Sequence, residues 1–156
     1  DAAFKTSADT KGLADFLMTL DLSGFDLAKI NAAMAAGDKD AAIKLGAFKG
    51  FRLTIADEKL LDAVFDIAAI DMGGTGAELR RSTPELIRLS GAPAAAANPR
   101  MADYAEAVAD FVAEGGALEI AARPAAPVKF EAFAATGQTA PQSLPDLINL
   151  SVTHRK

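Results

Sequence analysis

The chain has 156 residues, of which 51% are hydrophobic and 24% are charged, and this composition is typical of a folded globular protein. Its net charge of −5 argues against a nucleic-acid partner or an anionic membrane surface, because like charges repel. The absence of cysteine excludes disulfides and thiolate chemistry. The sequence also contains no apolar run of about 18 residues, so no transmembrane helix is predicted in it.

The N-terminal part of the sequence favours a β-hairpin followed by a helix. Polar and apolar residues alternate weakly over residues 3–7 and more strongly over residues 13–22, with a turn between them. Residues 13–22 also fit a helical spacing, but the glycines that bound this short run favour a strand. Asp26 is expected to cap a helix over residues 27–36, whose inward face includes Met34.

A strand and a second helix are expected next. Asp38 is expected to start a short helical turn, and residues 48–56 then alternate as a strand. Asp57 is expected to cap the following helix, which ends at Gly73-Gly74 because glycine enters left-handed geometry at little cost. The predicted inward stripe of this helix consists of Leu61, Val64, Phe65, Ala68 and Met72.

Two short helices and a linker are expected between residues 75 and 97. Thr75 is followed three residues later by Glu78, a capping-box pattern that predicts a short helix. Thr83-Pro84 is expected to begin another helix that ends at Gly91. The segment 91–97 contains no bulky side chain and is expected to be a linker.

The clearest local signals lie between residues 98 and 124. Asn98 is a good helix cap, and apolar residues then recur at three- and four-residue spacing until Gly115-Gly116 ends the helix. Residues 118–122 alternate as a strand, which Pro124 closes. This unit is expected to form the core.

The C-terminal part predicts short helices and a last strand. Residues 128–135 contain two phenylalanines and are expected to form a helical turn that plugs the core. Residues 137–145 are expected to be a loop, from which Ser143 caps a short helix, and residues 150–155 alternate as a final strand.

These elements predict an α+β domain over residues 1–156, with one mostly antiparallel sheet of about five strands and helices packed on one face. The strands alternate polar and apolar residues, whereas strands of a doubly wound parallel sheet are apolar throughout. The length fits about one domain. The chain is equally compatible with a fragment of a longer protein, so what precedes Asp1, including any signal peptide or anchor, stays open.

Two rows of carboxylates lie at helical spacing and are the first candidate site. The rows consist of Glu58, Asp62 and Asp66, and of Asp103, Glu106, Asp110 and Glu114. Such rows could bind cations or a basic partner, or supply an acid–base pair. The favoured interpretation is that they are the solvated faces of two amphipathic helices.

The remaining motifs favour structural roles. The glycine-rich segment 73–76 follows a helix instead of a strand and lacks the Lys-Ser/Thr pair of a phosphate loop, which favours a helix–helix connection. His154, the only histidine, is expected to be structurally incidental. On a strand Ser151 points away from it, which excludes a Ser–His relay. No catalytic, cofactor-binding or metal-ligating residue is therefore assigned.

Residues 115–133 resemble a segment of uncharacterised bacterial exported or cell-envelope proteins, including AsmA-like ones. In that segment G-x-L-x-(I/L)-x-x-x-P-x-x-P-(V/L) precedes a short helix and a terminal Leu-x-(L/V) strand. The matching residues are Gly116, Leu118, Ile120, Pro124, Pro127, Val128, Leu150 and Val152. The resemblance implies an exported protein in envelope organisation or lipid handling, and it brings no catalytic residues with it.

The expected function is that of a non-enzymatic domain of a bacterial cell-envelope protein, periplasmic or envelope-bound. It would act through protein–protein contacts or bind a hydrophobic, lipid-like small molecule, without a cofactor and without nucleic acid. The alternative is a carboxylate-based or metal-assisted hydrolase-like enzyme that uses Asp57, Asp62 or Asp71, and a cytoplasmic location also stays open.

Overall fold

The structure is a computed structural model that describes residues 1–24, 26–38 and 44–156. Of the described residues, 51% are helical and 30% lie in strands, and these strands form one antiparallel sheet of six. The predicted α+β class and the predominantly antiparallel sheet are therefore confirmed. The sheet has more than about five strands because a two-residue strand, β5, pairs with β3 beside the main path.

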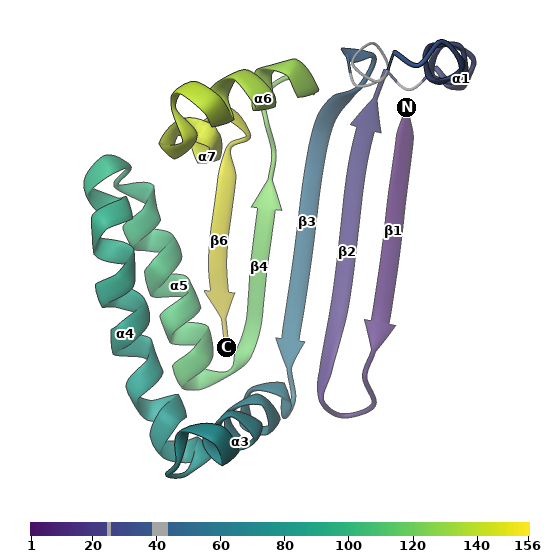
Figure 1. Ribbon diagram of the computed structural model, residues 1–156. Coiled ribbons are helices and arrows are strands. Elements are labelled where there is room, and N and C mark those ends of the chain that lie inside the picture. The colour runs from purple at the N-terminus through teal and green to yellow at the C-terminus, as the bar shows by residue number, and fades with distance from the viewer. Residues whose placement is uncertain (25, 39–43) are drawn as a thin grey trace. The chain divides into compact units, whose positions relative to one another are not determined.

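The sheet follows the chain order closely. Its path is β1-β2-β3-β4-β6, so every strand of the path lies beside the preceding one (Figure 1). Helices α3, α4 and α5 connect β3 to β4, and α6 and α7 connect β5 to β6. The elements are β1 (Ala2–Asp9), β2 (Ala14–Ser23), α1 (Leu27–Ala35), β3 (Ala47–Asp57), α3 (Leu60–Met72), α4 (Gly76–Ala97), α5 (Arg100–Glu114), β4 (Gly116–Ala122), β5 (Val128–Lys129), α6 (Phe130–Thr139), a 3₁₀ turn (Pro141–Ser143), α7 (Leu144–Leu147) and β6 (Leu150–Arg155).

The chain divides into two compact units that are assembled from non-contiguous segments. Unit 1 comprises residues 1–6, 19–52 and 121–150, and unit 2 comprises residues 7–18, 53–120 and 151–156. Each strand of the main path contributes residues to both units, so the division does not follow a linker in the sequence. The single domain over residues 1–156 stays a prediction.

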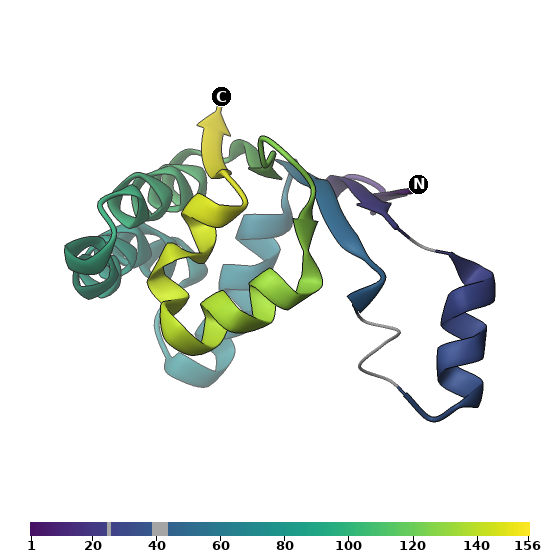
Figure 2. The ribbon, with the colours of Figure 1, turned by 90° about the horizontal axis from the view of Figure 1, so that it is seen from above.

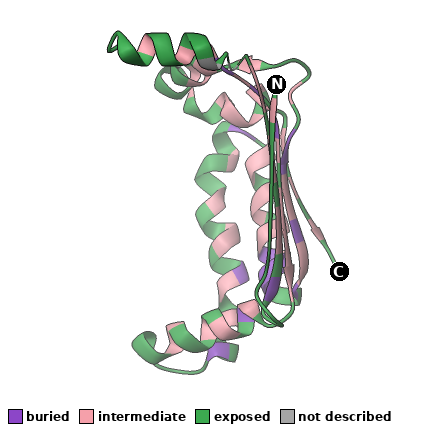
Figure 3. Cartoon of the chain, turned by 90° about the vertical axis from the view of Figure 1, so that its right-hand side faces the viewer, coloured by how far each residue is buried: buried purple, intermediate pink, exposed green. Residues whose placement is uncertain are grey.

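The core of unit 2 lies between its helices and its strand segments. In the edge-on view of Figure 3, α4 and α5 lie on one side of the strands, as the sequence predicted. The buried cluster consists of Leu61, Phe111, Val112 and Leu118. Partly buried side chains that pack against this cluster are Ile55, Phe65, Ile87, Val108, Ile120 and Val152. The predicted core unit at residues 98–124 therefore supplies most of the buried cluster.

The hairpin of β1 and β2 anchors the start of α3. The carbonyl oxygen of Leu13 accepts hydrogen bonds from the backbone N–H groups of Glu58, Lys59 and Leu60 at 3.0, 2.9 and 2.9 Å. Such N–H groups at the start of a helix have no partner within the helix itself. Asp57 contributes as well, because its Oδ1 accepts from the N–H of Leu61 at 3.0 Å. The N-cap position of α3 is Lys59 and not the predicted Asp57, because the helix begins later than expected, although the Asp57 carboxylate still accepts an N–H of the first turn.

One continuous helix, α4, replaces the two short helices and the linker that the sequence predicted. Thr75 and Glu78 form the expected capping box. The predicted linker over residues 91–97 is wrong, because alanine has the highest helix propensity and the run continues the helix. Gly91 allows α4 to approach α5, since a Cβ there would come within 2.8 Å of the Ala105 Cβ.

Unit 1 holds an aromatic cluster at the start of α6. The rings of Phe48 and Phe133 meet edge to face with centroids 5.6 Å apart, and Phe130 lies 6.4 Å from Phe133. Phe48 is buried and pairs with Val128 in the β3–β5 ladder. The predicted helical turn is present, but no residue of α6 is buried, so its phenylalanines pack around Phe48 and do not plug the main core. The helix runs on to Thr139, so the predicted loop begins too early. Next to α6 lies the short α7 (Figure 2).

Several other local predictions about unit 1 can be compared with the structure. Asp26 caps α1, since its carboxylate accepts from two backbone N–H groups of the first turn. The inward position predicted for Met34 is wrong, because its side chain is 53% exposed. Ser143 does not cap α7 with its side chain; its hydroxyl donates to the carbonyl of Ala140. The helical turn expected from Asp38 falls largely outside the described residues.

Candidate functional site

Helix α3 carries apolar side chains on two faces. One face includes the buried Leu61 and packs into the core of unit 2. On another face Val64, Ile67 and Ile70 are 49%, 66% and 80% exposed. Their three-residue spacing places them together on one side of the helix, and we call these three residues the α3 stripe.

The α3 stripe is not predicted by the periodicity of the sequence, which indicates a single inward face for this helix. The inward positions predicted for Val64 and Met72 are wrong, since Met72 is 73% exposed at the end of α3. The available signal was the presence of Ile67 and Ile70 where an amphipathic helix has polar residues. Full burial of an aliphatic side chain of this size stabilises a protein by about 1.5–3 kcal/mol, and the exposed side chains of the α3 stripe forgo this contribution within the described chain.

The surroundings of the α3 stripe are acidic. Four carboxylates and one amine lie on α3 and the two residues before it: Glu58, Asp62, Asp66, Asp71 and Lys59. Asp62 pairs with the guanidinium group of Arg80. The carboxylates of Glu58, Asp66 and Asp71 form no hydrogen bond or ion pair with the part of the chain that the structure describes. The predicted acidic row on this helix therefore borders an apolar surface.

The outer side of α4 carries a second exposed apolar pair. Leu86 and Leu89 are 61% and 63% exposed, and much of the surface of this helix is coloured as exposed in Figure 3. The pair is three residues apart and has Glu85 beside it. It is smaller than the α3 stripe and provides a matched comparison for it.

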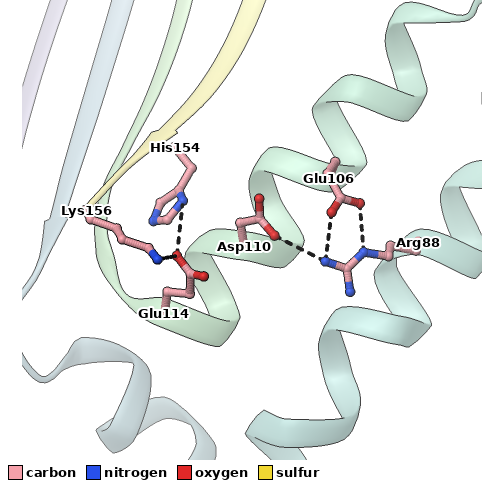
Figure 4. Close-up of polar contacts among 6 residues, drawn as sticks. All are labelled: Arg88, Glu106, Asp110, Glu114, His154 and Lys156. Carbon is pink, nitrogen blue, oxygen red and sulfur yellow. Dashed lines mark hydrogen bonds and ion pairs between the residues drawn. The ribbon is translucent and has the colours of Figure 1, made fainter.

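Two carboxylates of the acidic row on α5, Glu106 and Asp110, bind a residue of α4 and do not only face solvent. Arg88 of α4 donates from Nε and Nη2 to the two carboxylate oxygens of Glu106 at 2.7 and 2.9 Å, and from Nη2 to Asp110 at 3.2 Å (Figure 4). The hydrogen bond from Arg88 lowers the pKa of Glu106 and raises the pKa of Arg88 itself. This part of the row thus joins α4 to α5.

His154 also has a defined structural place. Its side chain is 9% exposed, and its Nε2 lies 2.7 Å from the carbonyl oxygen of Gly115, so this nitrogen carries the proton and donates. Glu114 lies 4.0 Å from Nδ1 and pairs with the amine of Lys156 at 3.1 Å (Figure 4). The prediction that His154 is incidental is wrong, because it fastens β6 to the end of α5.

Two clefts formed by described residues of unit 2 are candidate small-molecule sites. The larger, of about 450 Å³, is lined by Asp62, Ala77, Arg80, Arg81, Pro84 and Ala113. Arg80 is committed to structure there, because its Nε–H donates to the carbonyl of Val112 at 2.8 Å while the same group pairs with Asp62. The smaller, of about 270 Å³, is lined by Ser7, Ala8, Asp9, Asp15, Phe16, Leu17, Thr54 and Ala56. Charged groups therefore line both clefts.

The three carboxylates of the enzymatic alternative have separate structural surroundings. Asp57 accepts the N–H of Leu61, and Asp62 is held by Arg80. Asp71 lies in the last turn of α3, about 14 Å along the helix axis from Asp62. Asp62 and Asp71 therefore do not form a carboxylate pair. In the described ranges no group of three or more histidines and carboxylates could hold a metal ion.

Comparison with known proteins places the chain in a family. The model of a family described as "Uncharacterized protein" matches residues 7–155. The chain belongs to this family. No curated protein and no solved structure matches the chain. None of the helices described here is both long enough and apolar enough to cross a membrane.

Proposed function

We propose that the chain is a non-enzymatic domain of a bacterial cell-envelope protein that binds a protein partner through the α3 stripe. The observation that carries this proposal is the exposure of Val64, Ile67 and Ile70 on one side of a well-formed helix. An exposed apolar surface with a charged border is typical of protein interfaces, whose centres are apolar and whose rims are polar.

A protein partner fits the surface better than a lipid-like small molecule. Small apolar ligands bind in concave sites that are lined mainly by hydrophobic side chains. The larger cleft of unit 2 instead presents Asp62, Arg80 and Arg81. The smaller has the apolar Phe16 and Leu17 in its lining, but it also carries Asp9 and Asp15, for which an apolar ligand offers no partner. The α3 stripe lies on a helix surface, where another protein can cover it without an enclosed cavity.

The envelope location rests on the resemblance of residues 115–133 to exported bacterial proteins. Fractionation of the full-length gene product in its own bacterium tests this part of the proposal separately. We expect the protein in the periplasmic or membrane fraction. Recovery only with cytoplasmic markers would overturn the location and leave the binding surface to be tested by itself.

Site-specific photocrosslinking tests the binding surface. In one variant of the full-length protein, expressed in cells, the photoreactive residue p-benzoylphenylalanine is introduced in place of Ile67. In the control variant the same residue is introduced in place of Asp103, an exposed residue of α5. We expect a discrete crosslinked protein with the probe at position 67 and none with the probe at position 103. The absence of an adduct at positions 64, 67 and 70 alike would contradict the proposal.

A further inference from the structure

We infer that the α3 stripe binds an amphipathic helix whose apolar face is flanked by lysine or arginine side chains. This inference rests on the proposed function and specifies the partner of the same surface. Two features of α3 carry it: the spacing of the stripe and the charge around it.

The spacing of the α3 stripe suits another helix. Val64, Ile67 and Ile70 lie at positions i, i+3 and i+6, so they form one of the side-chain ridges that run along a helix surface. Such a ridge packs into the groove between two ridges of a neighbouring helix, with the axes about 8–10 Å apart. The exposed fraction rises from 49% at Val64 to 80% at Ile70, so the C-terminal half of the ridge is the more accessible.

The charge around the α3 stripe suits a basic partner. Asp71 lies in line with Val64 and Ile67 at the C-terminal end of the ridge, and Asp66 lies one turn before Ile70. Neither carboxylate has a hydrogen bond or ion pair among the residues with described positions. Lysine or arginine side chains beside the apolar face of a partner would meet these carboxylates at the rim, where charge complementarity accelerates association and suppresses wrong partners.

The same charges disfavour two other occupants. A second copy of the chain would bring identical acidic borders together across a two-fold axis, since such an interface uses the same surface on both subunits. The net charge of −5 adds to this repulsion. An anionic lipid surface is repelled for the same reason, because binding at a membrane surface relies on basic residues around the apolar face.

Peptide binding to the intact chain tests the inference. The probe is a fluorescein-labelled amphipathic helical peptide with a leucine face and lysine flanks, and its counterpart has glutamate at every lysine position. Titration with the intact chain is followed by fluorescence anisotropy at low salt. We expect the lysine peptide to bind at least about tenfold more tightly than the glutamate peptide, and its affinity to fall as salt is raised.

Matched variants locate the binding site on α3. The double variant Ile67→Ser/Ile70→Ser removes most of the α3 stripe, and Leu86→Ser/Leu89→Ser makes the equivalent change on α4. All four side chains are exposed, so both variants are expected to fold, as far-UV circular dichroism will verify. The α3 variant should lose lysine-peptide binding at least about tenfold, whereas the α4 variant should keep it. Asp71→Asn should weaken binding of the lysine peptide only.

Each outcome has a distinct meaning. Loss of binding in the α3 variant together with lysine preference supports the inference. Equal binding of both peptides, still lost in the α3 variant, overturns the basic partner but leaves the proposed function. Unchanged binding in the α3 variant overturns the site. Two further results would overturn the basic helix as the occupant. One is a dimer in analytical ultracentrifugation that the variant Ile67→Ser/Ile70→Ser no longer forms, which would make a second copy the occupant. The other is binding to phosphatidylethanolamine–phosphatidylglycerol vesicles that the same variant abolishes, which would make a membrane surface the occupant.

Discussion

At the scale of single residues, the turn between α5 and β4 is tightly constrained. Gly115 and Gly116 have φ angles of +72° and +81°, which side chains other than glycine rarely adopt. The carbonyl of Gly115 accepts the Nε2–H of His154, whose ring also lies 6.4 Å from that of Phe111. The glycine pair therefore does more than end a helix, because it positions the acceptor that holds β6.

Replacement of Gly116 by alanine should destabilise the protein by about 1–3 kcal/mol. An alanine here would have to adopt left-handed backbone geometry, and its Cβ would clash with the carbonyl oxygen of Arg155 and lie 3.1 Å from the Cα of Lys156. Gly137→Ala is the matched control, because Gly137 lies inside α6 with open space around it and should gain about 0.5–1 kcal/mol from better helix propensity. Urea denaturation measures both, and equal stability of the two variants would contradict this account.

At the scale of elements, two helices use their apolar residues in different ways. Helix α5 buries Ala109, Phe111 and Val112 and binds Arg88 of α4 through Glu106 and Asp110. Helix α3 buries only Leu61 fully and leaves a second apolar face in solvent. The first pattern explains how unit 2 is stabilised, and the second supports a binding role for α3.

Glu106→Gln should lower the melting temperature slightly at neutral pH, because it removes the negative charge of the carboxylate to which Arg88 donates from Nε and Nη2. Since folding lowers the pKa of Glu106, the contribution is present above its ordinary pKa of 4.5 and is lost as pH falls through the lower folded value. The melting temperatures of the variant and the wild type should therefore converge in acid. Asp103→Asn, at an exposed position of the same helix, should follow the wild type at every pH.

Thermal unfolding by circular dichroism between neutral pH and a pH below 4.5 makes this comparison. A constant difference between Glu106→Gln and the wild type over the whole range would show that the ion pair with Arg88 makes no contribution through charge. An equal loss in Asp103→Asn would show that general surface charge, and not this pair, sets the difference.

At the scale of the whole molecule, the two compact units share the strands of one sheet. Each of β1, β2, β3, β4 and β6 contributes residues to both units. Unfolding either unit would thus remove part of every main strand. A single cooperative transition is expected for this reason, although the chain clusters into two units.

Unfolding followed by two probes tests this cooperativity. Tyr104 is the only tyrosine, the chain has no tryptophan, and this residue lies in α5 of unit 2. Tyrosine fluorescence therefore reports on unit 2, whereas far-UV circular dichroism reports on the whole chain. The two urea transitions should coincide. A circular-dichroism transition without a matching fluorescence change would show that unit 1 unfolds independently.

Most of the element boundaries and the fold class follow from local patterns in the amino-acid sequence. Local backbone chemistry specifies the caps at Asp26 and Thr75 and the glycine stops at Gly73 and Gly115. Asn98 lies one residue before Pro99, the N-cap position of α5, and its Oδ1 accepts the N–H of Arg100. The errors arose where local rules conflicted. The segment 91–97 looked like a linker by composition, but its alanines favour the helix in which they lie.

Which helix faces are covered depends on how the helices and strands pack in three dimensions. The sequence shows the apolar residues Ile67 and Ile70 and their spacing on the helix. Their exposure is visible only in the structure, where both side chains are more than half exposed among the described residues. The partner of Arg88 and the acceptor for His154 likewise lie on other elements, at Glu106 and Gly115. Such contacts join residues that lie far apart in the sequence. They form only when helices and strands pack against one another, and the helix or strand preference of neighbouring residues does not specify that packing.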